Sequence, residues 1–178
     1  MNLSKIVTCA VFAVGVAGCT HPTDVGITSS KLNAYQPHIK RLLVLTELGS
    51  TLKMGDGETA FDTTLNNAMD TCGIAVNVHR HDPLALQNEE QLALKTFSPD
   101  TVMTLVWKSE HTYGNIPTSV VIMGSILDVS SKKVVWKSEI NLAPASHAGE
   151  TLAASIIERL KKENILGADC PMPVVPKP

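Results

Sequence analysis

The chain has 178 residues, of which 44% are hydrophobic and 18% charged, and its formal net charge is −2. This length is sufficient for one domain with a buried core. The near-neutral balance lacks the basic footprint of nucleic-acid binding, so we expect no nucleic-acid partner.

The chain begins with a charged and then apolar segment. Lys5 is followed by an apolar run over residues 6–17, too short for a membrane span but typical of a secretory signal. The ending Val16-Ala17-Gly18-Cys19 resembles the lipobox of bacterial lipoproteins. This resemblance implies a signal peptide over residues 1–18, cleavage before Cys19, and lipidation of Cys19 with diacylglycerol and an acyl chain such as palmitate. The alternatives are an ordinary secretory signal and a chance cysteine.

The residue after the cysteine bears on the destination of the protein. By resemblance to enterobacterial lipoproteins, Thr20 implies a lipid anchor in the outer membrane with the domain facing the periplasm. An inner-membrane or cell-surface location stays open.

Two cysteines remain in the expected mature chain, Cys72 and Cys170. Because exported proteins meet an oxidising compartment, we expect these two residues to form one disulfide bond. Two free thiols are the alternative, and the spacing does not match a redox motif.

Composition divides the mature chain into three parts. Polar and turn-forming residues over 19–39 predict a lipidated cysteine and flexible tether, followed by a folded domain over 40–166. Residues 167–178 predict a proline-rich tail, because they include Pro171, Pro173, Pro176 and Pro178.

The first half of the domain alternates strands and helices. The run 41–46 predicts a buried strand, 58–71 a helix that Gly73 ends, and 74–78 a second strand. Asp82-Pro83 predicts the start of a second helix that ends at Pro99-Asp100.

The second half is rich in β-formers. Residues 101–111, 119–129 and 134–142 predict strands, and the last two form a hairpin around a polar turn. We expect the charges Lys132, Lys133, Lys137 and Glu139 to protect an exposed sheet edge. A helix over about 148–164 carries an apolar stripe, and Trp107 and Trp136 are expected in the core.

The element order βαβαβββα predicts an α/β (α+β) sandwich: a mixed sheet of about four or five strands covered on one side by about three helices. The architecture of residues 40–165 resembles a group of periplasmic lipoproteins and assembly factors: the TolB N-terminal domain, CsgG and LpoB, with an anticodon-binding-domain-like fold. The matching segments are the strand from Arg41, the block 99–106, and the hairpin 124–136 with the helix after it. This resemblance implies binding to envelope machinery and carries over no catalytic residue.

Two motifs suggest chemistry. Ser50 and Lys53 have the spacing of penicillin-binding enzymes, but the partner motifs of that chemistry are absent from the sequence. His79 and His81 would face the same way on a strand and are weak metal candidates, with Asp82, His111 or His147 as further ligands. Acids at 56, 58 and 62 fit a helix start better than calcium.

Two functions therefore remain. The first is a membrane-anchored, non-catalytic binding or assembly module of the bacterial envelope, without a cofactor and with an unidentified envelope protein as its partner. The second is a small-ligand or metal-binding lipoprotein that uses His79 and His81. No enzyme is expected.

Overall fold

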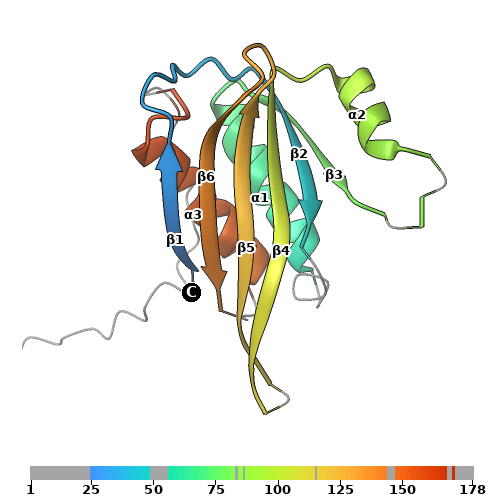
Figure 1. Cartoon of the computed structure of the whole chain (residues 1–178), viewed down its shortest axis with the longest axis vertical. Coiled ribbons are helices and arrows are strands. Elements are labelled where there is room, and N and C mark those ends of the chain that lie inside the picture. Colours follow the sequence, from blue (N-terminus) through green and yellow to red (C-terminus); the bar gives the residue numbers. More distant parts are fainter. Residues whose placement is uncertain are drawn as a thin grey trace, which may run out of the picture.

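The computed structural model describes residues 25–48, 56–82, 84–85, 87–114, 116–143, 147–167 and 170. Six strands and three helices occur in these ranges (Figure 1). The strands are β1 (Val25–Lys31), β2 (Arg41–Glu47), β3 (Ala75–Arg80), β4 (Thr101–Tyr113), β5 (Ile116–Asp128) and β6 (Lys133–Leu142). The helices are α1 (Gly57–Thr71), α2 (Glu89–Phe97) and α3 (Ala148–Lys162).

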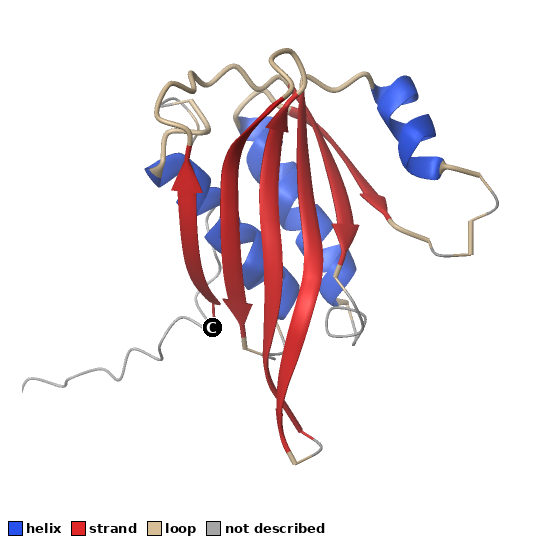
Figure 2. Cartoon of the chain, viewed as in Figure 1, coloured by secondary structure: helices blue, strands red, loops and turns tan. Residues whose placement is uncertain are grey.

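All six strands form one mixed sheet in the order β1-β6-β5-β4-β2-β3 (Figure 2). Strand β2 pairs in parallel with β3 and with β4, whereas β4, β5, β6 and β1 pair antiparallel. The expected α+β class with a mixed sheet is therefore confirmed, with one strand more than the upper expected number. The additional strand is β1.

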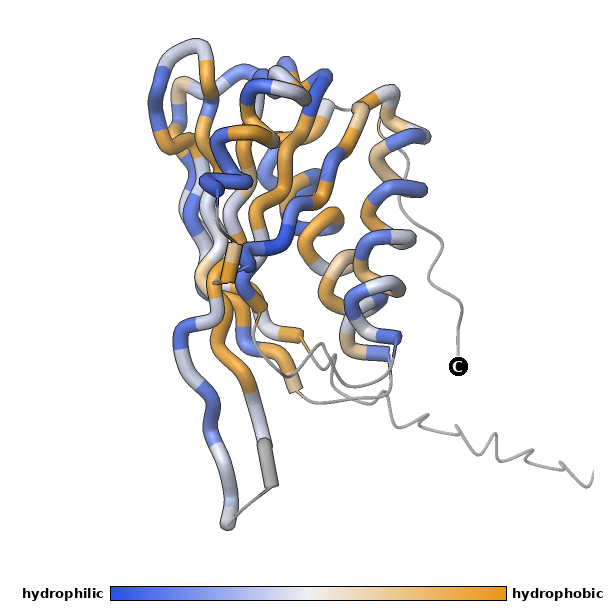
Figure 3. Tube along the Cα trace, turned by 90° about the vertical axis from the view of Figure 1, so that its right-hand side faces the viewer, coloured by the Kyte–Doolittle hydropathy of each residue, from blue (hydrophilic) through white to orange (hydrophobic). Residues whose placement is uncertain are grey.

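Helices α1 and α3 cover one face of the sheet, and the apolar residues of the chain gather between the two layers (Figure 3). Helix α1 buries Phe61, Leu65 and Met69 against this face, and α3 buries Leu152, Ile156 and Leu160. The two helices are in close contact at Gly149, where an added Cβ would lie 1.8 Å from the carbonyl oxygen of Gly57. A glycine is therefore required at this crossing.

Strand β6 anchors the core through Trp136, which is 1% exposed. Its indole Nε1 donates a 2.7 Å hydrogen bond to Glu163 Oε2, just after α3. Trp136 thus lies in the core as expected. Trp107 does not, because it is 40% exposed in the middle of β4.

The prediction of a flexible tether over residues 19–39 is wrong from Val25 onward, because β1 starts there. The folded domain therefore starts before residue 40. Strand β1 pairs with β6 along its whole length, and Val25 is buried. The apolar alternation of β1 is weak because Gly26 and two serines dilute it, as an edge strand permits. The charges of β6 consequently protect no edge, because β1 covers it.

Helix α2 is shorter than expected. Asp82 does not cap it: its carboxylate accepts a hydrogen bond from the Leu84 N–H, forming a local turn. The helix begins after Asn88, whose side chain accepts from the Gln91 N–H. Asn88 is followed by two glutamates that favour a helix N-terminus, and this signal outweighs the Asp82-Pro83 pair.

Candidate functional site

A groove lies between α2 and the edge strand β3. Val76 and Val78 of β3 pack against the core that α1 and α3 cover, so Asn77 and His79, which alternate with them, point to the opposite side of the sheet. The groove has a volume of about 390 Å³ and is lined by Asn77, His79, Glu89, Leu92, Ala93, Thr96 and Phe97. Its volume is in the range of small-ligand sites.

The groove combines apolar walls with an unsatisfied polar atom. The Nε2 atom of His79 is buried and has no hydrogen-bond partner among the described residues. Leu92 on α2 is 57% exposed beside it. A buried ring nitrogen without a partner costs free energy that an incoming donor or acceptor would recover.

The C-terminal end of α2 is fixed to the sheet. The guanidinium of Arg41 lies over the Phe97 ring, 4.6 Å from its centroid, and donates to the carbonyl oxygens of Phe97 and Ser98. Helix α2 has no fully buried residue, so this contact supplies much of its attachment. The groove is therefore fixed at the end near Phe97, and its α2 side exposes the apolar side chain of Leu92.

The free edge of β3 borders the same groove. The N–H of Ala75 donates to the carbonyl oxygen of Lys40, just before β2, and the N–H of His81 donates to that of Thr46 in β2. In a parallel pair, alternate residues bond to the partner strand. The backbone groups of Val76 and Val78 consequently point outward, away from β2. Unpaired groups of this kind are a template for an added strand.

The two histidines predicted as metal candidates have different neighbours. His79 lines the groove, whereas His81 Nδ1 lies 3.1 Å from Glu90 Oε1. Within the described ranges no group of three His, Cys, Asp or Glu side chains could hold a metal ion. Glu58 and Asp62 of α1 instead pair with Arg80 at 3.1 and 2.6 Å, so their role is an ion pair with β3.

A second polar cluster lies at the end of the sheet opposite the β4–β5 turn. The Asp128 carboxylate accepts hydrogen bonds from Ser130 and Ser131 in the β5–β6 turn. Burial raises the pKa of Asp128, but these hydrogen bonds outweigh burial and leave it below its ordinary value. Burial, with the nearby carboxylates of Asp128 and Asp100, raises the pKa of Tyr35 to about 12.

Asp100 belongs to the same cluster. Its carboxylate accepts from the backbone N–H groups of Lys40 and Arg41 at 2.9 and 3.1 Å. Both carboxylates thus fix strand ends and turns.

The expected cysteine pair is bonded in the structure. Cys72, just after α1, forms a disulfide with Cys170, and their Cα atoms are 4.5 Å apart. Cys170 is 3% exposed and lies in the core cluster. The bond ties the segment after α3 to the C-terminal end of α1.

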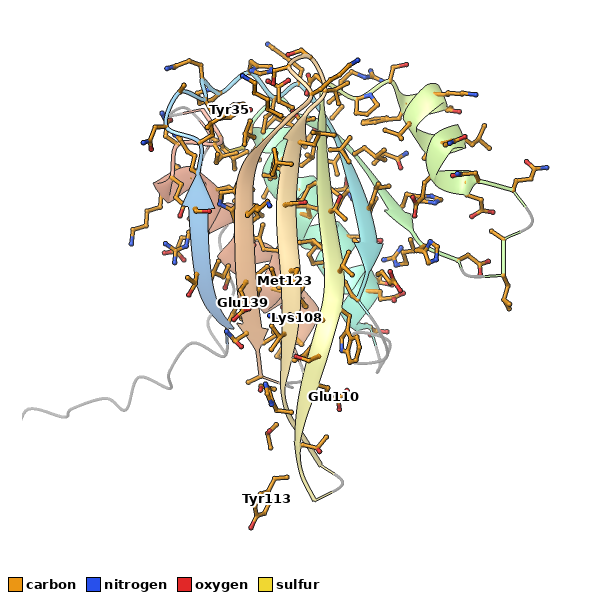
Figure 4. All side chains as sticks on the ribbon, in the orientation of Figure 1. Tyr35, Lys108, Glu110, Tyr113, Met123 and Glu139 are labelled. Atoms are coloured by element: carbon orange, nitrogen blue, oxygen red, sulfur yellow. A yellow bond between two sulfur atoms is a disulfide. The ribbon has the colours of Figure 1, made fainter. Side chains whose placement is uncertain are left out.

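The sheet face opposite α1 and α3 is open over its antiparallel half. In one row across it, Val106 and Met123 are directly paired and are 36% and 39% exposed, and Glu139 follows Met123 on β6. Lys108 binds Glu139 at 2.8 Å (Figure 4). Figure 4 also shows Tyr113 at the tip of the β4–β5 hairpin, with Glu110 partway along it.

Cys19, the predicted lipidation site, lies outside the described residues, as do Ser50 and Lys53, whose spacing alone did not predict a site. The groove itself was not predicted. The sequence holds one clue to it, namely the imperfect apolar spacing of Leu92 and Phe97 in the expected helix. Leu92 was expected on the buried side of that helix, but it is 57% exposed and lines the groove.

None of the helices in the described ranges has the length and hydrophobicity needed to cross a bilayer. No known family model and no curated protein sequence matches the chain.

Among solved structures, PelC from Paraburkholderia phytofirmans, determined as a dodecamer, aligns at 17% identity with a TM-score of 0.46, over 80% of this chain and 96% of that one. Protein XCC0632 from Xanthomonas campestris aligns at 12% identity with a TM-score of 0.40, over 78% and 92%. These similarities are distant and assign no function to this chain.

Proposed function

We propose that the protein is a lipid-anchored, non-catalytic binding module of the bacterial cell envelope, held at the outer membrane through Cys19 and facing the periplasm. The lipobox-like segment 16–19 supports the anchor. The Cys72–Cys170 disulfide supports export, because such bonds persist in oxidising compartments.

Metabolic labelling tests the anchor. Cells that express the wild-type chain and the Cys19→Ser variant are grown with alkynyl palmitate, and their membranes are fractionated. We expect label and outer-membrane recovery for the wild type and loss of both for the variant. Equal labelling of the two proteins would contradict lipidation at Cys19.

The groove between α2 and β3 carries the binding part of the proposal. Its two sides offer different contacts: outward backbone groups at Val76 and Val78 on β3, and the exposed side chain of Leu92 on α2. An extended segment of a partner protein suits both, because its backbone adds to the sheet edge while an apolar side chain enters the groove.

Site-specific photocrosslinking in cells tests this surface. A photoreactive amino acid at Leu92, in the groove, is compared with one at Val134, which is 45% exposed at the start of β6. We expect a defined protein adduct in the envelope from position 92 and none from position 134. Adducts at neither position, or the same adducts at both, would contradict binding at the groove.

A small hydrogen-bonding ligand is the second candidate occupant, because the His79 Nε2 atom is buried without a partner among the described residues. The purified protein is compared with His79→Gln by ligand-observed NMR in a periplasmic small-molecule extract, and zinc is titrated by calorimetry. Binding lost in His79→Gln supports this candidate. Identical spectra and no zinc heat would remove it, including its metal form.

A further inference from the structure

The N-terminal strand and the β4–β5 hairpin meet at one end of the sheet. Val25 pairs with Leu142, Leu142 with Val120, and Val120 with Glu110, so these four residues form one row across four strands. Strand β1 begins at this row and runs toward the far end of the sheet. The β4–β5 hairpin extends past the row on the other side, away from β1 (Figure 1).

The part of the hairpin beyond this row, residues 111–119, is here named the hairpin arm. Strand β2 ends at Glu47, which pairs with Val106, and β6 ends at Leu142. Among the described strands, none pairs with either edge of the arm. Figure 3 shows the arm projecting past both layers of the domain. An isolated two-stranded hairpin is at best marginally stable in water, so the arm gains from a surface to lie against.

Two lengths relate the arm to the N-terminal anchor. From Glu110 to Tyr113 the arm extends about 10 Å past the row, at about 3.4 Å per residue. The chain from Cys19 to Val25 spans at most about 20 Å when fully extended. A lipid on Cys19 therefore keeps Val25, and the row that begins with it, within about 20 Å of the bilayer. The tip of the arm, about 10 Å beyond that row, is then within reach of the bilayer surface.

The chemistry of the tip suits that surface. Tyr113 is 82% exposed and points away from the domain at the end of the arm (Figure 4). The sequence carries no charged residue from Thr112 to Leu127. Tyrosine is enriched at the membrane–water interface, where its ring contacts apolar material and its hydroxyl meets water.

We propose that the tip of the hairpin arm, through Tyr113, is a second membrane contact that lies in the interface of the same bilayer that holds the Cys19 lipid. This inference rests on the proposed lipid anchor. Two contacts, one covalent lipid and one aromatic tip, orient the sheet with its strands steep to the membrane. The α2–β3 groove is then held at a fixed angle to the bilayer.

Depth-dependent fluorescence quenching tests the contact. The lipidated full-length protein is purified with Thr112→Cys, which keeps Tyr113 and adds one exposed thiol to a chain whose Cys72 and Cys170 are bonded. The thiol is labelled with an environment-sensitive fluorophore. Val129→Cys, 38% exposed in the β5–β6 turn at the far end of the sheet, is the matched control. Both proteins are reconstituted in vesicles of phosphatidylethanolamine and phosphatidylglycerol with and without doxyl-labelled lipid.

We expect the label at position 112, next to Tyr113, to shift to shorter wavelength and to be quenched several-fold more strongly than the label at position 129. Flotation of the vesicles reports the anchor separately. A protein that floats but is quenched equally at both positions overturns the tip contact while leaving the anchor intact. A protein that does not float overturns the proposed anchor, and the tip contact with it.

Discussion

The Cys72–Cys170 disulfide closes a loop between residues 98 apart in the sequence. The perturbation is its removal, either by reduction or in the double variant Cys72→Ser/Cys170→Ser. In the chain-entropy model, a loop of this length removes about 5 kcal/mol of conformational freedom from the unfolded chain. For a domain of this size each kcal/mol moves the unfolding midpoint by about 2–4 °C, so the loss amounts to roughly 10–20 °C.

Thermal unfolding followed by circular dichroism, with and without reductant, measures this loss. We expect the midpoint of the wild type to fall on reduction to that of the double variant, and reductant to leave the double variant unchanged. A wild-type midpoint that does not respond to complete reduction would refute the reasoning. In that case the segment around Cys170 would be held by its packing alone.

Three further perturbations address the fold. Gly149→Ala places a Cβ on the carbonyl oxygen of Gly57, so α1 and α3 must separate. We expect the free energy of unfolding, measured in urea, to fall by about 3 kcal/mol. An unchanged urea midpoint would show that the helices do not cross this closely. Asp128→Ala removes the hydrogen bonds from Ser130 and should cost about 2 kcal/mol at neutral pH. Because the folded pKa of Asp128 is lowered, its contribution exists above about pH 3.8 and disappears as the pH falls below that value, so wild type and variant should converge in acid. The raised pKa of Tyr35 predicts a step in tyrosinate absorbance near pH 12 that Tyr35→Phe abolishes. Because the tyrosine of the unfolded chain ionises first, the stability of the wild type should fall above about pH 10. If both tyrosines titrated at pH 10, the burial of Tyr35 would be contradicted.

Strong periodicity made most of the domain predictable. The apolar run at β2 and the stripes of α1 and α3 bury large side chains, so sequence and structure agree there to within a few residues. The disulfide followed from composition and compartment, and Trp136 from its size. Each of these features depends on burial, which the order of apolar residues records directly.

The features that sequence analysis missed depend on pairing between distant segments. Strand β1 has little apolar character, and only its ladder with β6 makes it a strand. The α2–β3 groove exists because a short, weakly buried helix lies beside an edge strand, and no local pattern encodes that placement. The start of α2 was misjudged because two capping signals compete, and Asn88 with two following glutamates is the stronger.

The pairing of β1 with β6 also sets an order of assembly. Val25 finds its partner only at Leu142, so the first strand in the chain is among the last that can join the sheet. Until β6 has been synthesised and paired with β5, β1 has no ladder to join. The sheet can therefore be completed only when the whole span from Val25 to Leu142 is present, and a chain that ends before β6 would leave β1 unpaired.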